Sequence, residues 1–460
     1  MGADLGVESW RGVVRGAVEY LSPDKHPLQR MAEQDHQPAV TEAASSMRSR
    51  ERGVMAFGRY DYASFLTYFA YAAASVVAPV SLVSLARDLG FKLEDGGMTA
   101  GGALHLGRTA AIVAAMLLCA FWAGRWGKRR TLGGSVLLMG VGMGICAIAP
   151  AYGVVFLALV VAGVGEGAIE GVATPFVQDL HPREPGRYVN FSHAFWSIGV
   201  LVTVLAAGAL LSAGVSWRLI VGGVALGALL PACLLLIPPS RPEHAYPERQ
   251  QDLDSKAIGG KIRFILGIPR FWLFFAAMFL AGGGEFCLTF WSASFIQLGF
   301  STSAWVGGVG TACFAAGMAL GRMGGGYWVR QHHLKAFIVI SAIAGVVISL
   351  FLPQVRHLGL FLALLFLVGI ATAPFWPSIQ SYCADQIPEA DTTLLMILLS
   401  CAGIPGCGVA TWLMGYIGDR SGLGVAFYLV PACYLILGLL IGYEGYARKN
   451  KRRQLPGNPG

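Results

Sequence analysis

Charged residues are scarce in this sequence: they make up 13% of its 460 residues, whereas a soluble globular domain has roughly 25%. Hydrophobic residues make up 55%, and apolar stretches long enough to cross a lipid bilayer recur along the chain. The 61 glycines fit the same class, because small residues let membrane helices pack closely. This composition excludes an ordinary soluble protein and predicts an all-α membrane protein.

Several patterns typical of enzymes and metalloproteins are also absent. The nine cysteines form no CxxC pair and have no spacing suited to zinc, so we expect no metal site and no disulfide bonds. There is no P-loop and no convincing hydrolase motif. The glycine run at Gly163, Gly165 and Gly167 follows no predicted strand, which excludes a dinucleotide site. We therefore predict a protein that is not an enzyme, needs no cofactor and is not driven by ATP.

The net charge of +8 does not indicate nucleic-acid binding, because its basic residues cluster in connections on one side of the predicted membrane. By the positive-inside rule that side is cytoplasmic, with both termini inside. We expect a monomeric multi-pass protein of the plasma (inner) membrane, whose partners are the lipid bilayer and a small solute, with no nucleic acid. The main clusters are 125–130, Arg183 and Arg187, 261–270, Arg330 and Lys335, and 448–453.

Twelve predicted spans fall into two halves, separated by a polar stretch rich in proline and charge. The predicted parts are a polar cytoplasmic tail 1–56, a six-helix half 57–238, a linker 239–268, a second six-helix half 269–446 and a basic tail 447–460. The spans are 62–85, 99–123, 131–150, 153–178, 189–212, 217–237, 271–295, 304–326, 335–353, 358–382, 393–417 and 424–444.

Short sequences at the ends of the spans recur in both halves. Such six-helix repeats are typical of secondary transporters, whose substrate site lies near the bilayer midplane between the halves. The recurring pairs are Leu89–Phe91 with Leu298–Phe300, Trp122 and Arg125 with Trp328 and Arg330, and Asp179 and Pro182 with Asp385 and Pro388.

Polar residues within the spans are the candidate site, because an ionised side chain in hydrocarbon costs at least roughly 2.5–3.5 kcal/mol. Glu166, Glu170 and Thr174 share one face of the fourth span, since they are four residues apart. The two glutamates either line a cavity or pair with neighbouring helices. The matching positions of the tenth span are Thr372, Trp376 and Gln380, which predicts that the two helices line one cavity.

The fifth span carries a second polar stripe of Asn190, His193 and Ser197. His193 is either a packing residue or the partner of a carboxylate, with which it could hold or pass a proton. Trp196, Trp291 and Trp376 are candidates for stacking on a sugar ring, or are packing residues.

Three further charges lie in other spans. Glu285 follows a triple glycine, Gly282–Gly284, so its helix is either broken beside a cavity or packed tightly with Glu285 paired to an arginine. Arg108 meets an anionic substrate or pairs with a carboxylate. For Arg322, near the cytoplasmic half of the eighth span, a structural ion pair is favoured.

Two runs in the fourth and fifth spans, 170–177 (EGVATPFV) and 190–199 (NFSHAFWSIG), resemble the fucose–proton symporter branch of the major facilitator superfamily. The resemblance implies a twelve-helix major facilitator fold of two six-helix pseudo-repeats. It also implies that Glu170 is the proton- or substrate-linked carboxylate, supported by Asn190 and His193. This chain has Thr174 and His193 where the branch usually has Asn and Gln. It has Ser75 in place of an aspartate in the first span.

We therefore predict a secondary active transporter that takes up a sugar or sugar-like solute, neutral or acidic, with protons and by alternating access. Proton coupling needs a carboxylate whose pKa lies near ambient pH, and burial raises a carboxylate pKa in that direction. Two alternatives stay open. An exporter of drugs or metabolites would have a spacious apolar pocket, and a non-transporting sensor or assembly factor would have a collapsed cavity or polar stripes facing lipid.

Overall fold

A computed structural model describes residues 55–182, 185–238, 246 and 255–453. The chain forms two units, Met1–Phe57 and Gly58–Gly460, and the helices of the membrane bundle all belong to the second unit. Most of the predicted tail 1–56 and of the linker 239–268 lies outside the described residues. Within the linker, α10 spans Ser255–Leu266.

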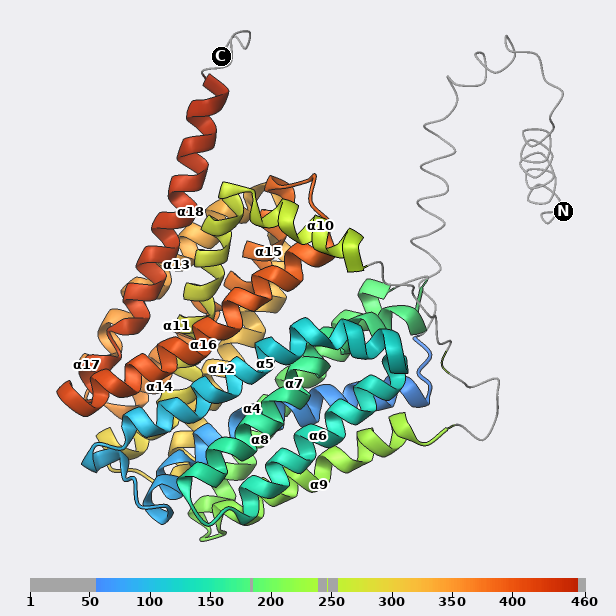
Figure 1. Ribbon diagram of the computed structural model, residues 1–460. Coiled ribbons are helices and arrows are strands. Elements are labelled where there is room, and N and C mark those ends of the chain that lie inside the picture. Colours follow the sequence, from blue (N-terminus) through green and yellow to red (C-terminus); the bar gives the residue numbers. More distant parts are fainter. Residues whose placement is uncertain (1–54, 183–184, 239–245, 247–254, 454–460) are drawn as a thin grey trace, which may run out of the picture. The chain divides into compact units, whose positions relative to one another are not determined.

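Twelve helices of the described chain are long and apolar enough to cross a membrane, as the sequence predicts (Figure 1). The first six are α4 (Arg59–Asp88), α5 (Met98–Trp126), α6 (Lys128–Ile148), α7 (Tyr152–Leu180), α8 (Pro185–Ser212) and α9 (Trp217–Leu236). The second six are α11 (Pro269–Gly299), α12 (Ala304–Trp328), α13 (Leu334–Phe351), α14 (Leu358–Thr372) with α15 (Phe375–Gln386), α16 (Thr392–Ser421), and α17 (Leu423–Ala426) with α18 (Leu429–Arg453).

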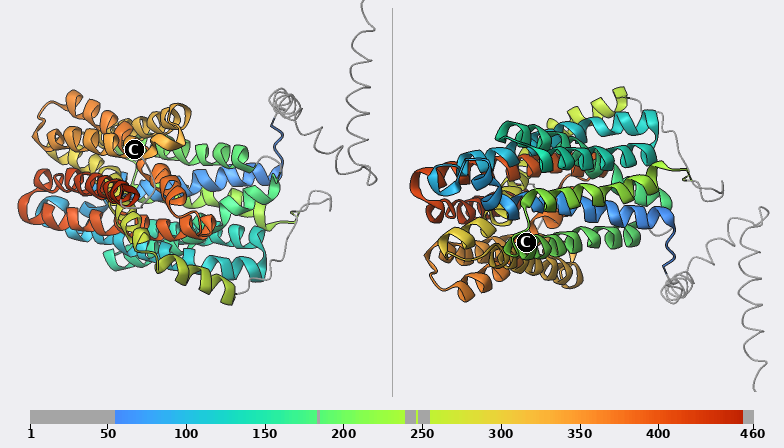
Figure 2. Two further views of the ribbon diagram at one scale, coloured as in Figure 1. Left: turned by 90° about the horizontal axis from the view of Figure 1, so that it is seen from above. Right: turned by 90° about the horizontal axis from the view of Figure 1, so that it is seen from below.

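The helix pairings repeat between the two halves. In the first half α4 packs on α8, α5 on α7 and α6 on α9; in the second half α11 packs on α16, α12 on α14 and α13 on α18. These are the same three pairings shifted by six spans. Figure 2 shows the blue-to-green and the yellow-to-red helices from two opposite directions. The two halves meet chiefly where α5 packs on α16 and α8 on α12.

The GxGxG run of α7 is a packing surface. A Cβ atom on Gly163 would lie 2.5 Å from the Arg108 carbonyl oxygen, and one on Gly167 would lie 2.1 Å from the Ile112 carbonyl oxygen, both on α5. A Cβ atom on Gly165 would lie 2.5 Å from the carbonyl oxygen of Ser135 on α6. Only glycine allows three backbones to approach this closely, and this approach brings Glu166 within hydrogen-bond distance of Arg108 on α5.

The triple glycine of α11 packs tightly and does not break the helix, which runs without interruption over Pro269–Gly299. A Cβ atom on Gly282 would lie 2.2 Å from the carbonyl oxygen of Gly403 on α16. One on Gly284 would lie 2.3 Å from the ring of Tyr434. Of the two interpretations of this motif, the structure supports close packing.

We predict that Gly282→Ala destabilises the protein, because the added methyl group meets backbone that cannot move aside. Overpacking of this kind costs about 1–3 kcal/mol. Gly227→Ala on α9 is the matched control, because a Cβ atom there meets nothing within 4 Å. The thermal midpoint of the purified protein in detergent, followed by size-exclusion chromatography, should fall for Gly282→Ala alone. Equal midpoints for the two variants would contradict this account of the motif.

The helix break lies instead in the tenth span, which is divided into α14 and α15 at Ala373 and Pro374. Its causes are Pro374 and Pro377, because neither has an N–H to donate to the carbonyl oxygen four residues earlier and each ring crowds that carbonyl. For Pro377 that carbonyl belongs to Ala373. The carbonyl group of Ala373 is therefore left without its helical donor. Proline at 374 and 377 is the sequence signal for this break.

The halves are joined at the end of the bundle opposite the basic connections. Asp419, near the end of α16, accepts hydrogen bonds from the backbone N–H groups of Met98 (2.8 Å) and Thr99 (2.7 Å) at the start of α5. Between α8 and α12, the backbone N–H of Trp305 donates to the Ser212 hydroxyl at 2.7 Å. These contacts join the two halves at the end that the charge distribution predicts to be outside.

Candidate functional site

Arg108 and Glu166 form an ion pair in the interior of the first half. Arg108 Nε donates to Glu166 Oε2 at 2.8 Å, and Arg108 Nη2 donates to Glu166 Oε1. Their side chains are 2% and 0% exposed. The guanidinium and the carboxylate engage each other along two parallel hydrogen bonds, which is the strongest geometry for such a pair. Of the alternatives for Arg108, pairing with a carboxylate is the one observed.

Glu170 differs from the other intramembrane carboxylates. It lies one turn after Glu166 on α7 and is half-buried. The hydroxyl of Tyr71 on α4 is a hydrogen-bond partner of its carboxylate, and Tyr71 also lies near Arg108 and Glu166. Among the described residues, no basic side chain lies within ion-pair distance of Glu170. A carboxylate bonded to a neutral hydroxyl is free to gain or lose a proton without breaking an ion pair.

His193 joins a hydrogen-bonded triangle beside Glu170. Its Nε2 atom lies 3.1 Å from the Tyr68 hydroxyl and 3.1 Å from Thr174 Oγ1, and these two hydroxyls are 3.1 Å apart. The Tyr68 hydroxyl also lies close enough to Glu170 for the two groups to interact electrostatically. The structure thus brings together Glu170, Thr174 and His193 around α4. Asn190 lies on α8, but its side chain is outside the described part of the chain.

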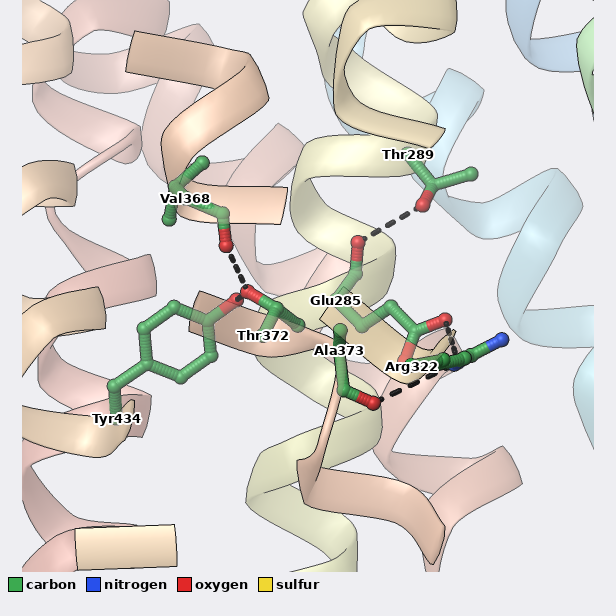
Figure 3. A network of polar contacts seen from close by, with 7 residues as sticks. All are labelled: Glu285, Thr289, Arg322, Val368, Thr372, Ala373 and Tyr434. Carbon is green, nitrogen blue, oxygen red and sulfur yellow. Dashed lines mark hydrogen bonds and ion pairs between the residues drawn. The ribbon is translucent and has the colours of Figure 1, made fainter. Parts of the chain in front are cut away.

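Glu285 is paired across the second half. Arg322 Nη2 lies 3.3 Å from Glu285 Oε1, and Arg322 Nε donates to the Ala373 carbonyl oxygen at 3.4 Å (Figure 3). This carbonyl is the one freed by Pro377. The ion pair that the sequence favoured for Arg322 is therefore present, and Glu285 is its partner.

Thr372 faces away from any cavity. It is 1% exposed, donates to the Val368 carbonyl oxygen at 2.8 Å, and lies 2.7 Å from the hydroxyl of Tyr434. Figure 3 shows this pair on the far side of α11 from Arg322. Thr372 thus forms a packing contact between α14 and α18. Its counterpart Glu166 instead forms an ion pair with Arg108.

Trp376 and Gln380 both contact α16. The Trp376 ring packs against Gly403 and adjoins the apolar cluster of Ile112, Met116 and Ile404, which joins α5 to α16. Gln380 Nε2 donates to the Ser400 hydroxyl at 3.2 Å. Trp376 therefore lies between the two halves, whereas Gln380 is tied to its own half.

A pocket lies between α8 of the first half and α11 and α12 of the second. Its volume is about 30 Å³, room for a few water molecules and too small for a sugar ring. The polar side chains at its wall are Ser197, Glu285, Thr289, Thr311 and Arg322, and Trp196 lies beside them. This mixture of an aromatic ring, hydroxyls and opposite charges is suited to a polar solute.

Two residues of the site, Tyr68 and Tyr71, were not identified from the sequence. Both lie on one face of α4, three residues apart, and both contribute hydroxyl groups next to Glu170. Tyrosines at helical spacing within an apolar span are the signal that could have found them. By contrast, Trp291 is fully buried and donates to the Thr411 carbonyl oxygen at 3.0 Å, so it is a packing residue.

A bundle of twelve membrane-crossing helices in two six-helix halves, with ion pairs and hydroxyls inside it, defines the class of multi-pass solute carriers. The chain matches the family model of the Major Facilitator Superfamily over residues 63–355 and 306–459. It belongs to that superfamily, and it is a membrane transporter and not an enzyme. No curated protein sequence matches it significantly.

Solved transporters share its fold at low sequence identity. A nucleoside transporter, NupG, superposes with a TM-score of 0.69 at 13% identity, covering 84% of this chain and 99% of its own. A D-xylose–proton symporter gives 0.68 at 14%, covering 83% and 96%. The fucose–proton symporter FucP of E. coli gives 0.58 at 16%, covering 83% and 98%. At these identities the similarity establishes the fold alone.

Proposed function

We propose that this transporter takes up a sugar or sugar-like solute together with protons, by alternating access, in the plasma (inner) membrane with both termini cytoplasmic. The observation that carries the proposal is the contrast among its three central carboxylates. Glu166 and Glu285 are held by arginines, whereas Glu170 has a tyrosine partner. Glu170 is thus the carboxylate that can exchange a proton at least cost.

The surroundings of Glu170 support a role in coupling. Tyr71 is hydrogen-bonded to Glu170, and Tyr68, which lies near the same carboxylate, is hydrogen-bonded to His193, so an imidazole lies close to Glu170. Protonation removes the charge of Glu170 and changes the hydrogen bonds it can make to the tyrosines. Because α4 contacts α11 of the other half, such a change acts where the two halves meet.

Other observations favour a polar solute over the two alternatives. The pocket between the halves is small and carries charged and hydroxyl groups, unlike the spacious apolar pocket expected of a drug exporter. The small volume alone also fits the collapsed cavity expected of a non-transporting relative. The polar stripes of α7 and α8, however, contact one another and α4, whereas that alternative predicts stripes that face lipid. The similarity in fold to xylose and fucose symporters is consistent with the same solute class.

Uptake into liposomes tests the proposal. Full-length purified protein would be reconstituted and offered a panel of radiolabelled sugars and sugar acids, with and without an inward proton gradient, and with protein-free liposomes as the control. We expect at least one solute to accumulate above its external concentration only when the gradient is present. Equal uptake with and without the gradient across the whole panel would contradict proton coupling.

A further inference from the structure

The two ion pairs of the interior differ in strength. Arg108 and Glu166 are joined by two hydrogen bonds, and both side chains are almost completely buried. Arg322 and Glu285 share a single 3.3 Å contact, and the side chain of Arg322 is 32% exposed. A long, single contact to a partly hydrated guanidinium is weaker than a buried bidentate one. Of the two arginines, Arg322 is the one able to change partners.

The guanidinium of Arg322 is held along one edge and open along the other. Its Nε atom donates to the Ala373 carbonyl oxygen, a group that neutralises none of its charge. Within the described part of the chain, no acceptor lies within hydrogen-bond distance of Nη1. In Figure 3 one end of the guanidinium points away from both Glu285 and Ala373. The break at Pro377 thus fixes the arginine in place and leaves donors free.

The open edge of Arg322 lies at the pocket between the halves. Trp196 and Ser197 of α8 form the opposite wall. Thr289 donates its proton to the backbone oxygen of Glu285 at 3.0 Å, so its oxygen still accepts hydrogen bonds. An aromatic face beside hydroxyl groups suits a ring or chain that bears hydroxyls, and a guanidinium edge matches a carboxylate.

We propose that Arg322 binds the carboxylate of a sugar acid or similar hydroxyl-bearing acid, which displaces Glu285 as its partner. The inference rests on the proposed function and specifies the substrate class of the same carrier. It moves the anion site from Arg108, which the sequence offered for this role, to an arginine of the second half. Because the pocket is too small for a sugar ring in this conformation, binding requires the two halves to move apart. Trp196 then packs on the carbon face of the solute, and Ser197 and Thr289 meet its hydroxyls.

Matched pairs of labelled solutes test the substrate class. Glucuronate and glucose, galacturonate and galactose, and gluconate and sorbitol differ chiefly in the carboxylate. With full-length protein in liposomes, we expect the acid of at least one pair to enter at least about tenfold faster than its neutral partner, the discrimination that one charged hydrogen bond provides. Preference for the neutral members, or transport of none of the six, overturns the inference.

Substitutions at the ion pair separate binding from structure. Arg322→Ala should raise the KM for the acid by about tenfold to a hundredfold, and Arg322→Lys should raise it less. Glu285→Gln should lower the KM, because the competing carboxylate is gone. Arg356→Ala, at an exposed position, should leave it unchanged. If the ion pair were only structural, Arg322→Ala and Glu285→Gln would impair transport alike. A raised KM in Glu285→Gln therefore overturns the inference.

The pH gradient distinguishes this inference from the proposed function. Acid-selective uptake through the protein that ignores the gradient would contradict proton coupling and leave Arg322 as the anion site. Gradient-driven accumulation of a neutral sugar, with Arg322→Ala still active on it, would preserve the proposed function and overturn the anion site. Protein-free liposomes measure the passive entry of each acid and are subtracted in both cases.

Discussion

Glu170→Gln should abolish concentrative uptake while leaving exchange of solute across the membrane intact. Glutamine has the shape of a protonated glutamate and keeps a side chain able to bond Tyr71, which is the partner of Glu170. The variant therefore stays permanently in the protonated form. Exchange requires no net deprotonation, so the loaded carrier still reorients. Accumulation requires release of the proton inside, which glutamine cannot perform.

The size of the effect follows from the driving force. A gradient of one pH unit is worth about 1.36 kcal/mol, or tenfold, so a carrier coupling one proton to one neutral solute accumulates it up to about tenfold. For Glu170→Gln the ratio of internal to external solute concentration should fall to about one. Counterflow of labelled solute measures exchange, and uptake under an imposed gradient measures accumulation, both in the same liposomes. Glu389→Gln, at an exposed position in the connection after α15, is the control of equal chemistry.

His193→Gln provides a graded comparison. An amide retains the ability to bond Tyr68 and Thr174, the two partners of His193, so accumulation should persist with a shifted pH optimum. Effects of the two substitutions should not add, because contacting residues share interaction energy. Undiminished accumulation by Glu170→Gln would refute its assignment and direct attention to Glu166 and Glu285.

The helices and their number could be predicted from sequence because the bilayer fixes the length of each apolar run. Individual contacts could not. Arg108 and Glu166 lie on different helices, and no local pattern states that the glycines of α7 bring these helices together. The triple glycine of α11 illustrates the same limit, since glycine both weakens helices and permits close packing, and only the neighbouring Gly403 decides between them.

The candidate site was predicted in part. The stripe of α7 correctly placed Glu170 and Thr174 on one face, but the tyrosines that contact them come from α4, which carries no charge near that depth. The repeat predicted that the helix faces of Glu166 and Thr372 line one cavity. Tyr434, which has no counterpart motif in the first half, binds Thr372 away from the pocket. Repeats preserve helix positions more faithfully than they preserve the function of each side chain.

Arg108→Leu should destabilise the protein severely, and adding Glu166→Leu should restore much of the loss. The single substitution leaves a buried carboxylate without its guanidinium partner, and breaking such a pair costs on the order of 3–5 kcal/mol. Replacing both residues by leucine removes both charges from the apolar interior. Buried ion pairs exchanged for apolar residues of similar size are often neutral or stabilising.

A double-mutant cycle measures this coupling. The yield of monodisperse protein and its thermal midpoint in detergent would be determined for the wild type, the two single variants and the double variant, with Arg356→Leu at an exposed site as the control. Losses that simply add would show that the two residues act independently, against the bidentate geometry observed. If the double variant is stable and also accumulates solute under a proton gradient, Glu166 has no part in the proton cycle. Glu170 is then the one glutamate of α7 left to carry the proton.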